Sequence, residues 1–177
     1  MLFNVGGLLI GATETTSHTV TNATQYLLAH PDRLASARAA AALPNPALFD
    51  GHVYEALRYR PAFPYYFRTC HVPSTLAAET PHAATVTAGT TVLAVTHSAM
   101  FDVAGFPDPD AFVPTRDQSD SFTFGQGIHA CLGIAIASVM VPEIVRQIIL
   151  RADLSAPAPP DYRGGRVPES WRLRYRA

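Results

Sequence analysis

An apolar run near the N-terminus limits the folds that are open to this chain. Leu2 to Ala29 predicts one long helix, and His30-Pro31 ends it because proline disfavours helical geometry in the residue before it. Val5 to Ala12 has no polar face, whereas a helix on a protein surface carries a polar stripe. The helix also begins without a capping residue. We therefore expect the chain to start within an element whose covering layers lie outside it.

The rest of the chain combines helices with a region of short strands and loops. Short β-branched or aromatic segments, with Gly89 as a turn signal, predict strands, and the prolines between Phe106 and Pro114 predict irregular backbone. Further helices are expected at Pro31–Ala42, Ala47–Tyr59 and Leu132–Leu150, the last despite Pro142, and strands at Tyr65–His71, Ala84–Thr87, Thr91–Thr96 and, after the connector Ala156–Pro160, around Trp171–Tyr175. The pattern predicts a mainly α fold with small β-sheets, in the α+β class.

The composition excludes several classes of protein. Of the 177 residues, 48% are hydrophobic and the formal net charge is -1, so no basic surface for nucleic acid or an anionic membrane is indicated. The N-terminus lacks the features of a signal peptide, and its apolar run is too short to span a bilayer. We expect a cytoplasmic protein without a membrane span. The two cysteines, Cys70 and Cys131, do not share the spacing of a metal-finger or redox motif.

One loop combines rare residues at a characteristic spacing. Phe124 to Gly133 reads Phe-Gly-Gln-Gly-Ile-His-Ala-Cys-Leu-Gly and precedes an apolar helix. Gly125 and Gly127 permit tight turns with positive φ. A lone cysteine usually behaves as a small buried hydrophobe, which is our interpretation of Cys70. The loop around Cys131, by contrast, resembles the heme-binding signature of the cytochrome P450 family at all its defining positions.

This resemblance implies a role for each special residue of the loop. Cys131 would be the proximal thiolate ligand of a heme iron, a ligand that favours cleavage of a bound O–O bond. The turns at Gly125 and Gly127 would aim amide N–H groups at the sulfur and tune its donor strength. The other positions would have supporting roles: Phe124 would shield the sulfur from water, His129 would hydrogen-bond a heme propionate, and Gly133 would let the following helix approach the ring.

A second motif of the family precedes the cysteine loop. Glu55-Ala56-Leu57-Arg58 places Glu55 and Arg58 on one helix face, where they can pair, and resembles the Glu-x-x-Arg pair that locks the family's core behind the heme. Taken alone, a glutamate and an arginine at this spacing also fit a solvated helix surface.

A third motif lies in the long apolar helix. Gly11 to Thr16 reads Gly-Ala-Thr-Glu-Thr-Thr and resembles the family's oxygen-activating segment. Small residues would leave room for dioxygen, while the Glu14 carboxylate and the Thr15 hydroxyl would relay protons. The alternatives are a solvated charge at Glu14, which its apolar surroundings disfavour, and a Thr15 hydroxyl bonded back to the helix. Arg68 stands where the family often has a strand arginine that pairs with a propionate, and a surface arginine is the alternative.

The chain departs from the family at two positions and in length. Ala111 stands where the family has an arginine that completes a triad with the Glu-x-x-Arg pair, and Arg116 is the nearest substitute. Ala12 replaces the second glycine of the oxygen-activating segment. The chain is less than half of a typical family domain, so residues 1–177 are expected to form the C-terminal portion of the cytochrome P450 fold, from the oxygen-activating helix to the C-terminal strands. Such a portion would expose its apolar helix.

The resemblance implies a heme-thiolate oxidoreductase of the monooxygenase type, which inserts one oxygen atom of O2 into a small apolar organic substrate. A ferredoxin or a flavoprotein would deliver electrons at the cysteine-loop face. Two alternatives stay open: an isomerase that rearranges hydroperoxides in partnership with a fatty-acid dioxygenase, and an inactive truncated fragment. The tail Asp161–Gly165 and the missing arginine at Ala111 are the features that favour an atypical member such as the isomerase.

Overall fold

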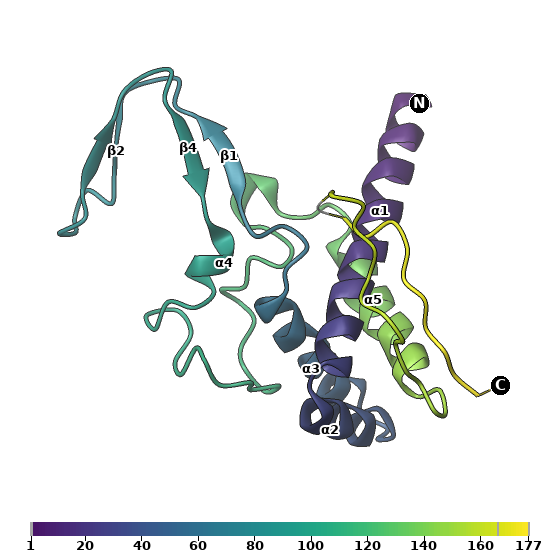
Figure 1. Cartoon of the computed structure of the whole chain (residues 1–177). Coiled ribbons are helices and arrows are strands. Elements are labelled where there is room, and N and C mark those ends of the chain that lie inside the picture. The colour runs from purple at the N-terminus through teal and green to yellow at the C-terminus, as the bar shows by residue number, and fades with distance from the viewer. Residues whose placement is uncertain (1, 166, 177) are drawn as a thin grey trace.

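In the described residues, four long helices pack around one hydrophobic core and two small antiparallel ribbons project from them (Figure 1). The computed structural model describes residues 2–165 and 167–176. The helices are α1 (Leu2–Leu28), α2 (Pro31–Ala41), α3 (Pro46–Tyr59) and α5 (Ile134–Ile149), with α4 (Thr96–Ala99) and the 3-10 turn η1 (Gly127–His129) between them. The predicted long helices are confirmed to within two residues at each end. None of these described helices is long and apolar enough to cross a membrane.

Side chains from α2 and α5 cap each other's C-terminal ends. Arg146 Nε donates to the carbonyl oxygen of Ala41 at 3.1 Å, and Arg38 Nε donates to that of Ile149 at 2.8 Å. The last carbonyl groups of a helix have no partner within the helix, so each bond satisfies a group that would otherwise need water. The exchange of caps fixes the relative position of the two helices.

Pro142 lies inside α5, and a side chain of α3 compensates for the hydrogen bond that it removes. Proline has no backbone N–H, so the carbonyl group of Ser138 lacks its donor within the helix. The Tyr54 hydroxyl donates to this carbonyl oxygen at 2.7 Å. Burial and the nearby charge of Asp50 raise the pKa of Tyr54 to about 12, so the hydroxyl keeps its proton at neutral pH. This bond explains how α5 accommodates Pro142 and joins α5 to α3.

The core contains the second half of α1 and the inner faces of α2, α3 and α5. Its buried side chains are Val20, Ala23, Tyr26, Leu27, Ala37, Ala40, Ala41, Phe49, Val53, Ala56, Leu57, Val141, Val145 and Ile149. The N-terminal half of α1 lies outside this core and extends beyond the other helices (Figure 1). Phe3 and Ile10, for example, are 95% and 73% exposed. The apolar run is therefore uncovered in this chain, as expected for a partial domain.

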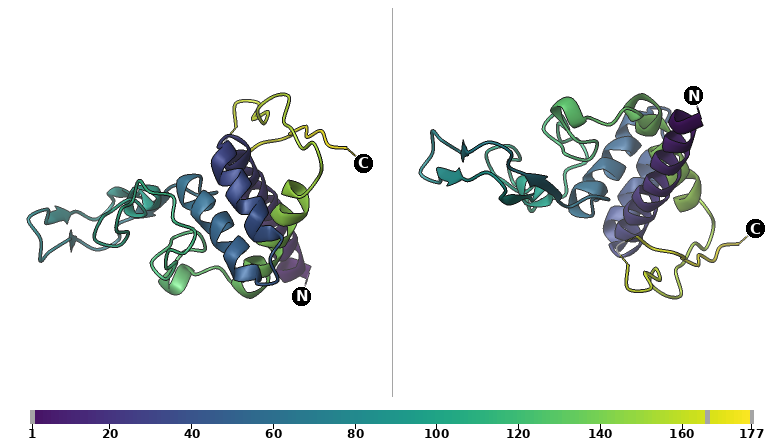
Figure 2. Two further views of the ribbon diagram at one scale, coloured as in Figure 1. Left: turned by 90° about the horizontal axis from the view of Figure 1, so that it is seen from below. Right: turned by 90° about the horizontal axis from the view of Figure 1, so that it is seen from above.

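Within the described residues, four short strands form two antiparallel ribbons. β1 (Tyr66–Thr69) pairs with β4 (Thr91–Ala94), and β2 (Ser74–Leu76) pairs with β3 (Ala84–Val86). The sequence does not predict β2, because its three residues are all exposed and carry no alternating pattern. Gly89 has a φ of 85°, which fits the predicted turn. The ribbons point away from the helices in both views of Figure 2.

Two predictions for this part of the chain need correction. Cys70 is not a core residue: it is half-buried at the end of β1, and its Sγ donates to the carbonyl oxygen of Val72 at 2.9 Å. The thin ribbon has no core beneath it that could bury the thiol. The strand predicted around Trp171–Tyr175 is reduced to isolated bridges, one of which joins Arg174 to Ser155.

Candidate functional site

The cysteine loop turns back on itself through two glycines. Gly125 and Gly127 have φ values of 65° and 62°, so the predicted positive-φ turns are confirmed. The Cys131 N–H donates to the carbonyl oxygen of Phe124 at 2.7 Å, which closes the loop. A Cβ atom on Gly125 would lie 2.8 Å from the carbonyl oxygen of His129, so this position requires glycine for space as well as for φ.

The loop leaves Cys131 exposed. Its neighbours Ile128 and Leu132 are 95% and 93% exposed. The Phe124 ring packs edge-on against Tyr54 of α3, with ring centroids 6.2 Å apart. The Phe124 ring thus lies against α3, and shielding of the sulfur by Phe124 stays a prediction.

His129 and Gly133 are the remaining predicted residues of the loop. His129 is exposed at the end of η1 and has an N–H available for an acceptor. Gly133 precedes α5, and a Cβ atom placed on it would lie 3.9 Å from the Cys131 Sγ. That is an ordinary contact, so within this chain the space around Gly133 does not require glycine.

Strand β1 lies beside the cysteine loop (Figure 1). Burial raises the pKa of Tyr66, the positive charge of Arg68 opposes this effect, and the nearby Cys131 adds to the rise. These three side chains are therefore close enough to interact electrostatically. Arg68 is exposed; its guanidinium carbon lies 5.4 Å from the Tyr66 ring centroid, and it donates to the carbonyl oxygen of Phe67 at 2.8 Å.

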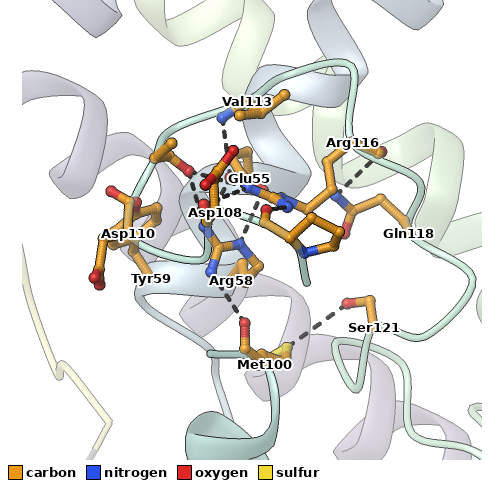
Figure 3. A network of polar contacts seen from close by, with 12 residues as sticks. Glu55, Arg58, Tyr59, Met100, Asp108, Asp110, Val113, Arg116, Gln118 and Ser121 are labelled. Atoms are coloured by element: carbon orange, nitrogen blue, oxygen red, sulfur yellow. Dashed lines mark hydrogen bonds and ion pairs between the residues drawn. The ribbon is translucent and has the colours of Figure 1, made fainter. Parts of the chain in front are cut away.

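Glu55 and Arg58 form a two-pronged ion pair on α3, and both side chains are 0% exposed. Arg58 Nη2 donates to Glu55 Oε1 at 2.8 Å and Arg58 Nε donates to Oε2 at 3.0 Å. Burial lowers the pKa of Arg58, but the hydrogen bonds and charge of Glu55 outweigh this effect and the pKa is raised overall. The other donors reach the carbonyl oxygens of Met100 and Ala111 at 3.0 and 3.1 Å. Figure 3 shows this pair enclosed by two loops.

A second guanidinium group, that of Arg116, reaches the same carboxylate (Figure 3). Arg116 Nε lies 3.3 Å from Glu55 Oε1, and the Arg116 side chain is 7% exposed. Its other N–H groups donate to the carbonyl oxygens of Pro107, Asp108 and Ala111 at 2.5, 3.1 and 3.2 Å. Two arginines therefore share Glu55 although position 111 is alanine. The only sequence signal for this contact is that Arg116 is the arginine nearest to Ala111.

Glu14 and Thr15 lie on α1, and no hydrogen bond or ion pair links them to the cysteine loop within the described ranges. Glu14 is exposed on the uncovered side of the helix, so the apolar surroundings expected from its neighbours are absent. It borders an open hollow of about 490 Å³ together with tail residues that include Tyr162. The Thr15 hydroxyl donates to the carbonyl oxygen of Gly11, which is the back-bonded arrangement weighed for this residue.

Solved structures of cytochromes P450 share this fold. The chain superimposes on CalO2 with a TM-score of 0.81 and 25% identity, over 97% of this chain and 42% of that one. It superimposes on cytochrome P450 CYP109Q5 from Chondromyces apiculatus with a TM-score of 0.75 and 28% identity, over 95% of this chain and 42% of that one. The helices and ribbons therefore form part of a P450 fold.

Sequence relatives identify the family. A cytochrome P450 family model matches residues 1–161. The chain is 36% identical over 145 residues to the cytochrome P450 monooxygenase PikC of Streptomyces venezuelae, covering 81% of this chain and 32% of the relative. It is 33% identical over 145 residues to a steroid C26-monooxygenase of Mycolicibacterium smegmatis, covering 81% and 33%. The chain belongs to the cytochrome P450 family and spans about a third of the length of these relatives.

The cysteine loop fits the heme that this family carries. Its donor is an exposed thiol, and a thiolate is a suitable axial ligand for heme iron. The loop also exposes the apolar side chains of Ile128 and Leu132, and burying such surface against an apolar ring would be favourable. The exposed N–H donors of Arg68 and His129 suit the carboxylates at the edge of such a ring.

Proposed function

We propose that this chain is the heme-binding part of a cytochrome P450 monooxygenase, with Cys131 as the thiolate ligand of the iron. The observation that carries the proposal is an exposed cysteine in a loop closed by the bond from Cys131 N–H to Phe124 and turned at two positive-φ glycines. The heme supplies the activation of dioxygen when bound. Relatives named as monooxygenases support the reaction class.

Residues of the cysteine loop and β1 are proposed to hold the cofactor. The turns at Gly125 and Gly127 are proposed to orient loop amides toward the sulfur once heme is bound, because hydrogen bonds to a thiolate lower its donor strength. Arg68 and His129 are proposed to bind the propionates through charge-assisted hydrogen bonds. These contacts would fix the ring in one orientation beside the loop.

Glu14 and Thr15 are proposed to move protons on the oxygen-activating side. The Thr15 hydroxyl donates to the Gly11 carbonyl, so its oxygen retains lone pairs that can accept a hydrogen bond. The Glu14 carboxylate can exchange protons with water in the hollow that it borders. Both residues need the uncovered half of α1 to be enclosed, because exposed charges are screened by bulk water.

The proposed substrate is a small apolar organic molecule, and the proposed electron donor is a ferredoxin or a flavoprotein. The apolar surface of α1 before Glu14 supports an apolar substrate, because the exposed side chains there include Leu8, Leu9 and Ile10. Electron delivery is proposed at the cysteine-loop face, because this loop carries the proposed iron ligand Cys131 and lies at the surface of the described chain.

The test is an absorption spectrum of the hemin-loaded, reduced chain with carbon monoxide. We expect a Soret band at the thiolate position that Cys131→Ala abolishes and Cys70→Ala leaves in place. Cys70 is the matched control because it is the second free cysteine of the described chain and lies on the ribbon. A soluble, hemin-loaded wild-type chain without this band, or a band that survives in Cys131→Ala, would contradict the assignment.

A further inference from the structure

Arg33 of α2 lies among three aromatic rings. Its guanidinium carbon is 5.2 Å from the ring centroid of Tyr26, 5.3 Å from that of Tyr59 and 4.9 Å from that of Phe112. Tyr26 stacks on both other rings, with centroids 5.1 Å from Tyr59 and 5.8 Å from Phe112. A cation within about 6 Å of a ring face is attracted by the ring quadrupole. One charge from α2 therefore joins rings from α1, α3 and a loop.

Phe112 belongs to the loop that covers the buried ion pair of α3. Residues 107–113 contain no helix or strand, so side chains and single hydrogen bonds must hold them in place. On one side of Phe112, the Ala111 carbonyl oxygen accepts from the buried guanidinium at 3.1 Å. On the other side, the Val113 N–H donates to the buried carboxylate at 3.0 Å. Phe112 therefore lies in the chain directly between two groups that satisfy the ion pair.

The aromatic cage also anchors this loop through its backbone. The Tyr59 hydroxyl donates to the carbonyl oxygen of Asp110 at 2.6 Å, so a second member of the cage binds the same stretch. Phe112 itself is partly buried against the hydrophobic core. Ala111, whose side chain is a single methyl group, contributes no polar side-chain anchor at the centre of the loop. Displacing the cation from the cage would therefore loosen the loop where it contacts the ion pair.

We propose that Arg33 is a positioning residue, which holds Phe112 and through it residues 107–113 against the Glu55–Arg58 pair. Arg33 acts through the rings rather than by bonding to the pair. This inference deepens the proposed function. Its relevance to heme binding rests on that function, in which the Glu55–Arg58 pair supports the core behind the heme. The arrangement itself is independent of heme.

The experiment is amide hydrogen exchange, followed by NMR on the full chain without heme. In Arg33→Met we expect the Ala111 and Val113 amides to exchange roughly 3- to 30-fold faster, the factor that corresponds to losing a partly desolvated cation–π contact. Core amides of α1, such as that of Leu27, should keep their rates. Arg33→Lys retains the cation and should restore slow exchange at both positions.

The matched control is Arg151→Met. Arg151 also lies over a ring, with its guanidinium carbon 5.5 Å from the Tyr175 centroid, but it is exposed and contacts the tail. This variant should leave the Ala111 and Val113 rates unchanged. If Arg33→Met does not fold, Phe112→Leu removes the ring from the other side and should speed the same two amides.

Two results would overturn the inference. Unchanged exchange at Ala111 and Val113 in the folded variants would show that Arg33 does not position the loop. The inference would also fail if Arg33→Met accelerated exchange equally at these amides and at the α1 core amides and Arg33→Lys did not restore slow exchange. That result would show only a general loss of stability. Because the measurement uses no heme, its failure is distinct from the failure of the carbon monoxide test on Cys131.

Discussion

The buried Glu55 carboxylate provides the most quantitative prediction. Glu55→Gln keeps the size of the side chain but removes the negative charge that two guanidinium groups share, those of Arg58 and Arg116. Removing one partner of a buried pair typically costs about 3–5 kcal/mol, because the remaining charge stays desolvated without compensation. A small domain has a total stability of only about 5–15 kcal/mol. We therefore expect a large fall in the urea midpoint of the variant, measured by circular dichroism.

The chain contains a matched control for this substitution. Glu143 and Arg146 have the same i,i+3 spacing on α5, at 3.3 Å, but Arg146 is 35% and Glu143 50% exposed. Exposed pairs contribute about 0–1 kcal/mol, so Glu143→Gln should barely move the urea midpoint. If Glu55→Gln were within about 1 kcal/mol of the wild type, or no worse than Glu143→Gln, the reasoning from burial would be refuted.

Three further predictions concern single contacts. Tyr54→Phe should lower the unfolding free energy by about 1–3 kcal/mol, because the Ser138 carbonyl oxygen loses its donor. Adding Pro142→Ala supplies a backbone amide to this carbonyl group and should restore part of the loss. Purely additive effects of the two substitutions would contradict this explanation. Arg116→Met should lower the urea midpoint, because Glu55 and the Ala111 carbonyl oxygen lose a donor. Adding Ala111→Arg should recover the midpoint if a guanidinium group from position 111 can reach Glu55. No recovery in a folded double variant would show that Arg116 is required. Burial lowers the pKa of His18 despite the opposing charge of Glu14, so the unfolded chain binds this proton more readily and stability falls as pH drops through the ordinary value of 6.5. His18→Gln should reduce the difference in urea midpoint between about pH 7.5 and pH 5, and an undiminished difference would exclude His18 as a source.

The shared use of Glu55 shows how the structure answers a question that the sequence leaves open. Ala111 interrupts the family motif, and from the sequence Arg116 is only the nearest arginine. Whether it reaches the carboxylate depends on how closely the loop approaches α3. A Cβ atom on Gly51 of α3 would lie 1.9 Å from the carbonyl oxygen of Pro114, so this close approach requires glycine at position 51. Such a contact between distant segments has no local signature.

The sequence by itself determined the features that depend on neighbouring residues. The end of α1 follows from the proline of His30-Pro31, and the positive-φ turns at Gly125 and Gly127 follow from the missing Cβ atom. The cysteine loop could be recognised for the same reason, because its special residues lie within one short segment. Conformational preferences of this kind act over a few residues and can be read along the chain.

Only the tertiary structure decided which distant groups meet and which stay open. The hydroxyl of Tyr54 satisfies the carbonyl group that Pro142 leaves without a donor, and Arg33 collects three rings from separate elements. Glu14 is exposed although an apolar run precedes it, because burial depends on what packs against α1 and not on the composition of α1 itself. These outcomes depend on packing between segments far apart in the chain, which local preferences do not specify.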